Sequence, residues 1–451
     1  MDEQTERPVL KPGFTYATVT DQISSIVLSQ RTPRNWWIGF GIAFLLVIVF
    51  TGSVIYLLLA GVGIWGLNIP VAWGLDITNM VWWAGIAHAG TLISALLLIL
   101  RQEWRASISR MTEAMTLFAA AIGALFPLLH LGRIQFFYYI FPYPNTMGLW
   151  PQFRSPLVWD VFAVLAHTML PFFFFYLALI PDFATLRDRA RLRSRQKMFN
   201  LLALGWRGSA KHWHHYRTAY FLLAVLFIPM VIALHSIISY TFAVTLVPGW
   251  HATLFPPYFV AGAVYSGFAM ILTIAILLRG FYRLEHFITL RHLDNMAKIM
   301  LAAGIVVAYG YLIENFMAWY SGNELEIFIY ADRLTGMYGP VLWSFLLLGI
   351  LAPQLLWFQR FRSRVPLLFL ISILVNVSMW LQRFMIVVTS LHRDHLPSAW
   401  GAYAPTLLEW ALFFGTLGLF AALLFLFIRF LPVISIFEMR ELVEEQQEQV
   451  G

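Results

Sequence analysis

Four ionisable side chains lie within or beside long apolar segments of this sequence. Asp160 and His167 are seven residues apart, a spacing that places both on one face of a helix. His130 ends a second apolar segment, and Arg383 lies in a third, flanked by aromatic residues. A carboxylate and an imidazole can accept protons, while a guanidinium can orient an oxygen atom. These residue types predict a site for proton-coupled chemistry on a small molecule.

The composition predicts that these segments lie in a membrane. Of the 451 residues, 60% are hydrophobic and only 12% are charged, about half of the roughly 25% found in soluble proteins. This excludes water-soluble domains, disorder and most nucleic-acid binders. Because the chain has no cysteine, it cannot itself hold a disulfide, an iron–sulfur cluster or a covalently attached haem.

Ten segments are each long enough to cross a bilayer as a helix, which needs about 20 apolar residues. They are predicted at residues 36–60, 79–100, 112–130, 157–180, 218–243, 256–279, 297–321, 337–357, 366–391 and 404–430. The fold class is therefore an all-α membrane protein with ten transmembrane helices. Residues 1–35 are predicted to form a polar tail, and residues 431–451 an acidic, solvated one.

The basic residues predict the orientation of these spans. Of the 30 lysines and arginines, 25 fall on one set of alternating loops and 5 on the other. Cytoplasmic loops carry such an excess, so both termini are predicted to be cytoplasmic. The net charge of +7 is thereby explained by loops beside lipid headgroups, without a nucleic acid.

Two short motifs recur at nearly constant offsets and predict an internal duplication. Residues 84–90 resemble residues 261–267, and residues 155–160 resemble residues 339–344. Spans 2–5 (residues 79–243) and spans 6–9 (residues 256–391) would then be parallel four-helix bundles, flanked by spans 1 and 10. Asp160 has no acidic counterpart in the second bundle, so the site is predicted in the first.

The four ionisable residues are predicted to converge near the outer surface, where they fit a lipid-soluble quinol. Asp160 and His130 would accept its protons, and Arg383 would position the ring. His167, Arg133 and Gln135 are predicted to line the same pocket. These residues also have structural interpretations. Asp160 could neutralise Arg383 or cap a helix, His130 could lie at the interface, and His167 could be a core histidine. Arg383 could extend outward to lipid headgroups, and Arg133 could make surface contacts.

The chain resembles a known family, the NrfD/polysulfide-reductase-type membrane subunits, and most closely the ActC type found in bacterial alternative complex III. Matching motifs cover nearly all of the hydrophobic chain. They are residues 73–79, 82–88, 130–133, 155–160, 234–236 and, as the most distinctive, the run Pro248 to Gly262.

The resemblance implies a subunit of a respiratory or photosynthetic complex that oxidises menaquinol near the outer face of a bacterial inner membrane. The family's proposed quinol residues map onto His130, Asp160 and Arg383. Implied partners are a molybdopterin-enzyme-like iron–sulfur subunit, a multi-haem cytochrome c subunit and a paralogous membrane subunit. Haems and clusters would belong to these partners.

Members of this family are also discussed as proton conduits. The polar residues that would form such a route, each with interhelical hydrogen bonding as the alternative, are His88, Tyr265, Ser266, Tyr309, Glu314 and Glu409. Two rival functions stay open. Duplicated bundles with buried charges are also typical of secondary transporters, and the chain could instead anchor a terminal reductase and reduce quinone.

Overall fold

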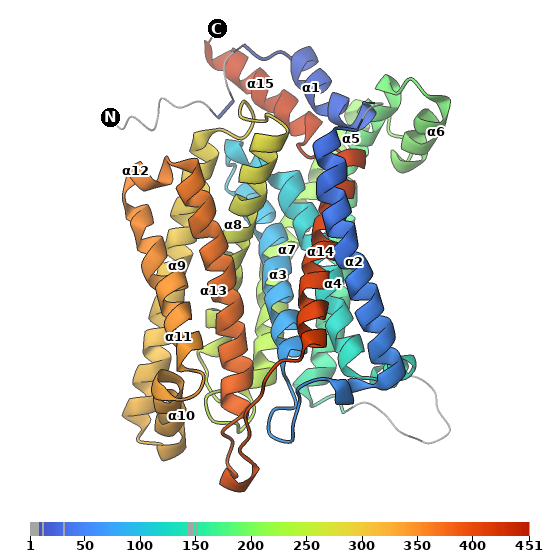
Figure 1. Cartoon of the computed structure of the whole chain (residues 1–451). Helices are drawn as coiled ribbons and strands as arrows, with labels where there is room; N and C mark the ends of the chain where they lie inside the picture. Colours follow the sequence, from blue (N-terminus) through green and yellow to red (C-terminus); the bar gives the residue numbers. More distant parts are fainter. Residues whose placement is uncertain (1–8, 11–12, 30–31, 142–147, 149–151, 451) are drawn as a thin grey trace.

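The computed structural model describes residues 9–10, 13–29, 32–141, 148 and 152–450, and in that part all regular elements are helices, without strands. Ten helical segments in it are long and apolar enough to cross a membrane, which confirms the predicted span count (Figure 1). These segments are α2 (Arg34–Ala60), α3 (Leu75–Ile99), α4 (Ser109–His130), α5 (Pro156–Arg189), α7 (Ala210–Ala243), α8 (Phe255–Phe281), α9 (Leu290–Ser321), the irregular span Gly339–Trp357, α13 (Val365–Leu391) and α14 (Leu407–Phe430).

The irregular span contains α11 (Gly339–Phe345), a π-helical turn (Leu346–Leu351) and a 3-10 turn (Ala352–Trp357). Pro353 has no N–H group to donate to the preceding turn. Hydroxyl groups of neighbouring helices donate hydrogen bonds to backbone carbonyls of this span. Tyr265 donates to the Gly349 carbonyl at 2.5 Å, and Ser378 donates to the Phe345 carbonyl at 3.0 Å. Interhelical hydrogen bonds therefore make a broken helix tolerable at membrane depth.

The helix α3 runs through the middle of the molecule and is buried along most of its length (Figure 1). It packs on α8 through the two motifs that resemble each other in sequence. A Cβ atom added to Gly267 would lie 2.0 Å from the Cβ of Ala89, so only glycine allows this approach. The motifs therefore form the contact between the two halves of the chain, while the duplication itself stays a prediction.

The first and last described helices, α1 (Tyr16–Leu28) and α15 (Ile436–Val450), lie at one end of the bundle, here called the terminal face, together with α6 (Arg193–Leu202) (Figure 1). The other end, here called the opposite face, carries most of the long loops. Its short elements are the 3-10 turns Val62–Ile64, Ile134–Ile140 and Pro397–Ala399 and the helix α10 (Glu324–Thr335). Two further short elements, Glu103–Ser107 and α12 (Gln359–Arg362), lie on the terminal side of the spans.

The described parts of both predicted tails contain helices that pack on the rest of the chain. The helices α1 and α15 pack against each other and bury Val19, Ile23, Met439 and Val443. Apolar residues at helical spacing give each tail one face that packs on the bundle. Of the predicted N-terminal tail, residues 1–8, 11–12 and 30–31 lie outside the described residues, as does residue 451 at the C-terminus.

A group of buried charges ties α15 to the bundle. Arg105 pairs with Glu438 of α15 at 2.6 Å, and the fully buried Arg110 pairs with Asp182 at 3.2 Å and Glu113 at 3.3 Å. Arg110 also donates to the Ser435 hydroxyl, just before α15. Since a buried charge without its partner is costly, these contacts require α15 to stay docked.

This docking predicts that Glu438→Ala destabilises the protein by about 3 kcal/mol or more, because Arg105 and Ser109 both lose their acceptor. Tryptophan-fluorescence melting in detergent would measure the loss. The matched control is Glu445→Ala on the exposed side of α15. Equal melting temperatures for the two variants would contradict the role given to the buried pair.

Candidate functional site

His130 and an aspartate that sequence reasoning did not select form a close pair at the opposite face. His130 ends α4, Asp76 lies in the first turn of α3, and His130 Nδ1 lies 2.5 Å from Asp76 Oδ2. The carboxylate is buried, whereas 30% of the His130 side chain is exposed. With Nδ1 engaged by Asp76, Nε2 is the nitrogen available to a molecule at this face.

The start of α3, and with it Asp76, is held in place from the side of α14. The Leu75 N–H donates to the Tyr403 hydroxyl at 2.8 Å, and that hydroxyl donates to Glu409 at 2.5 Å. Burial raises the pKa of Tyr403, and the hydrogen bond to Glu409 raises it further, so the phenol keeps its proton. Glu409 also accepts from the N–H of Gly66 at 2.9 Å.

Glu409 is therefore fully engaged in joining two loops to the start of α14, where it also forms a capping box with Thr406. Its contacts match the interhelical hydrogen bonding that was the alternative to a proton-route role. That role stays a prediction for this residue.

Asp160 lies in the second turn of α5, and only one of its two carboxylate oxygens accepts a hydrogen bond. Its Oδ2 accepts from the Thr241 hydroxyl of α7 at 2.6 Å, and its Oδ1 has no hydrogen-bond partner among the described residues. The residue is 8% exposed. No ion pair joins Asp160 to Arg383 in the described part of the chain. Asp160 thus keeps one buried oxygen without a hydrogen-bond donor among the described residues.

Arg383 is buried at the junction of α3, α8 and α13. Its guanidinium donates to Gln382 and lies 4.7 Å from the centre of the Phe259 ring, a cation–π contact. A Cβ atom at Gly262 would lie 2.9 Å from Arg383 Nη2, so the glycine makes room for the cation. In the described structure neither Asp160 nor His130 contacts this group directly, so the predicted convergence of all four residues is not seen as one cluster.

His167 belongs to a separate group of three histidines inside the first bundle. Its ring stacks on His88 of α3 at 3.7 Å between centroids, and His88 lies 4.6 Å from His235 of α7. Only Nδ1 of His88 has a partner, the Ala84 carbonyl at 2.6 Å, and the other five ring nitrogens have none in the described structure. The sequence pattern did not predict this grouping.

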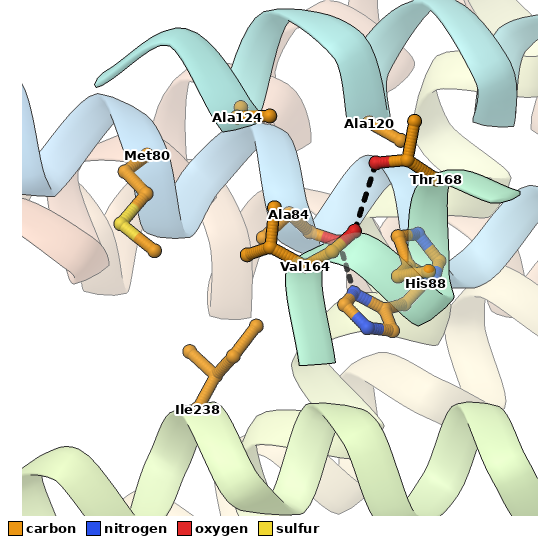
Figure 2. Close-up of a pocket in the computed structure, with 10 residues that line it drawn as sticks. Met80, Ala84, His88, Ala120, Ala124, Val164, Thr168 and Ile238 are labelled. Carbon is orange, nitrogen blue, oxygen red and sulfur yellow. Dashed lines mark hydrogen bonds between the residues drawn. The ribbon is translucent and has the colours of Figure 1, made fainter. Parts of the chain in front are cut away.

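A small cavity of about 20 Å³ borders the stacked His88 and His167 rings (Figure 2). Its other walls are mostly small or apolar side chains of four helices, namely Met80, Ala84, Ala120, Gly123, Ala124, Val164, Thr168 and Ile238. The space suits about one water molecule and is too small for an aromatic head group. His167 therefore lies beside a water-sized space, and its predicted quinol contact stays a prediction.

The remaining predicted residues lie in several places. Arg133 and Gln135 are exposed at the opposite face, just after His130. Ser266 is buried and donates to the Ala263 carbonyl at 3.1 Å, much as Tyr265 donates to Gly349. Tyr309 lies on the outer surface of the helix bundle, where it is 61% exposed, and its place in a proton route stays a prediction.

Glu314 is buried in the second bundle, where Tyr330 donates a hydrogen bond to it. Its Oε1 has no partner among the described residues. Glu314 is thus the one acidic member of the predicted route that keeps a free oxygen in the interior, whereas Glu409 is fully bound.

Two comparisons with known proteins agree with this architecture. A putative dimethyl sulfoxide reductase membrane subunit from Halobacterium salinarum is 26% identical over 443 residues, covering 90% of this chain and 93% of the relative. A selenate reductase subunit from Mesobacillus selenatarsenatis is 21% identical over 384 residues, covering 81% and 86%. The profile of the family described as "Polysulphide reductase, NrfD" matches residues 64–393. The chain therefore belongs to the NrfD family of polysulphide-reductase-type membrane subunits.

Proposed function

We propose that this subunit oxidises a quinol at the opposite face and passes the electrons to a peripheral iron–sulfur subunit. The observation that carries the proposal is the free Oδ1 of the buried Asp160, at the same face as the partly exposed His130. Both groups can accept a proton. Family membership supports the coarser statement that the chain is a membrane subunit of an oxidoreductase complex that interacts with quinone.

Oxidation of one quinol releases two protons and two electrons. Asp160 Oδ1 and His130 Nε2 each accept one proton, while the electrons leave one at a time to the iron–sulfur subunit. Arg133 and Gln135 flank the entry from the exposed turn beside His130. Arg383 lies deeper and acts through the field of its charge, because no acidic side chain pairs with it in the described structure.

We further propose that the quinol is menaquinol and that the terminal face is cytoplasmic, as the excess of basic loops there suggests. The opposite face would then release protons outside a bacterial inner membrane. Partners would include a multi-haem cytochrome c subunit and a paralogous membrane subunit besides the iron–sulfur subunit. Any route for translocated protons would start from the three histidines and Glu314, which keep unpaired atoms inside the bundles.

A second candidate follows from the relatives, which are named as subunits of dimethyl sulfoxide and selenate reductases. In that case the chain anchors a terminal reductase and exchanges electrons between quinone and the catalytic subunit. Purification in mild detergent distinguishes the two, because a multi-haem subunit would co-purify only in the first. A secondary transporter has less support, since both relatives are named as reductase subunits.

The role proposed for Asp160 predicts a clear loss of activity when its carboxylate is replaced. In the assembled complex, Asp160→Asn should lower quinol oxidation about 100-fold, because the amide cannot accept the proton. The control is Asp188→Asn, which removes an exposed carboxylate at the terminal face. Turnover equal to that of the control, in a normally assembled complex, would remove Asp160 from the mechanism.

The proposed orientation can be tested directly, because the native chain has no cysteine and gives no labelling background. Single cysteines would replace Leu396, exposed at the opposite face, and Glu445, exposed at the terminal face. A membrane-impermeant maleimide added to intact cells should label Leu396→Cys and spare Glu445→Cys until the cells are lysed. The reverse pattern would contradict the assigned sides.

A further inference from the structure

We infer that Asp76 is a positioning residue of the quinol site, which acts through His130. The inference rests on the function proposed above. Asp76 holds the imidazole so that Nε2 faces the substrate as an acceptor, and its charge stabilises the imidazolium that forms when the proton arrives. Nothing in the sequence pattern assigned a role to this residue beyond its place in a matching motif.

The first support is the geometry of the pair. Asp76 Oδ2 lies 2.5 Å from His130 Nδ1, and Asp76 Oδ1 accepts from the Gly74 N–H at 3.2 Å. An ionised carboxylate only accepts hydrogen bonds, so the neutral imidazole must carry its hydrogen on Nδ1. The lone pair is then on Nε2, which makes that nitrogen the base.

The second support is the way in which Asp76 itself is fixed. The next N–H along the chain, that of Leu75, is bound by Tyr403, and Tyr403 is bound by Glu409 of α14. A Cβ atom at Gly74 would lie 2.6 Å from the Tyr403 hydroxyl oxygen, so the two residues are in close contact. These contacts hold Asp76 in place. A precisely placed base such as His130 requires this, because the carboxylate that orients it must not move.

The third support is the charge distribution around His130. Asp76, from α3, is the charged group in hydrogen-bond contact with the ring. On the side of α14, the Tyr403 hydroxyl donates to Glu409 and accepts from the N–H of Leu75, the residue before Asp76. Trp65 contributes a neutral ring, 6.5 Å away between centroids. On α5, Asp160 is bound to Thr241. Arg133, three residues after His130 and beyond the end of α4, is exposed. The imidazolium would therefore be stabilised mainly by Asp76.

The proposed oxidation accounts for both protons and both electrons of the quinol. One quinol hydroxyl gives its proton to His130 Nε2, the other gives its proton to Asp160, and two electrons pass to iron–sulfur clusters of the partner subunit. His130 is protonated on both nitrogens at this stage, and Asp76 Oδ2 accepts the hydrogen bond from its Nδ1–H. Because part of the His130 side chain is exposed, the proton can then leave to the solvent at the opposite face.

The test uses Asp76→Asn in the intact complex, with menadiol as the soluble naphthoquinol and steady-state rates from about pH 5 to 9. We expect kcat to fall about 10- to 100-fold with KM changed less than about twofold. The acid limb of the pH–rate profile should move to lower pH, because without the carboxylate the imidazole stays neutral at higher acidity. Asp76→Glu, which keeps the charge, should return the acid limb toward its native position.

Asp188→Asn serves as the control for loss of an unrelated carboxylate. A native rate and a native pH profile in Asp76→Asn would overturn the inference. If that variant does not assemble, Tyr403→Phe carries the test, because it removes the support of Asp76 and leaves the pair itself in place. It should lower kcat several-fold without moving the acid limb, and a native kcat would overturn the inference. A native complex that does not oxidise menadiol or menaquinol at all would instead contradict the proposed function.

Discussion

A buried polar group in this protein must find its partner inside the bundle, because lipid offers none. This constraint explains where the charges lie. At the terminal face, Arg105 and Arg110 are matched by carboxylates, one of them from α15. At the opposite face, Asp76 is matched by His130 and Glu409 by Tyr403. The middle of the first bundle contains three histidines, which can be neutral.

Several buried polar atoms are exceptions to this matching, and some of them belong to groups to which we assign function. Asp160 has one oxygen without a partner, and the His130 pair is open to the outside on one side. Arg383 has an aromatic ring and an amide instead of a carboxylate. Unmatched groups cost stability in a bilayer. Their presence at one face and at the junction of the two halves therefore favours a functional explanation over a structural one.

Much of the fold could be predicted from the sequence, because apolar length and charge bias depend on local composition. All ten spans were found, although α5, α7 and α9 extend farther at the terminal face than their apolar segments predicted. The eighth span was predicted as a continuous helix, and Pro353 alone did not reveal the π-helical turn, which depends on hydroxyls from α8 and α13. The docked tails were missed because their partners are buried charges far away in sequence, such as Glu438 with Arg105.

The site was predicted less completely for a similar reason. Residue types and depth selected His130, Asp160 and Arg383, but depth alone does not say which side chains face each other. Asp76 lies at the start of a span, where an acidic residue is ordinary at a helix N-terminus. Its role emerges only from the 2.5 Å contact with His130. Likewise, the grouping of His88, His167 and His235 depends on how three helices are rotated about their axes.

The central claim is that a quinol head group binds beside His130 and Asp160. Photoaffinity labelling of the intact complex with an azido-naphthoquinone, followed by peptide mapping, tests it most directly. The account predicts adducts in the peptides that contain the end of α4 and the start of α5, reduced by excess menaquinone. Specific adducts confined to α9 or α13 in the second bundle would contradict it.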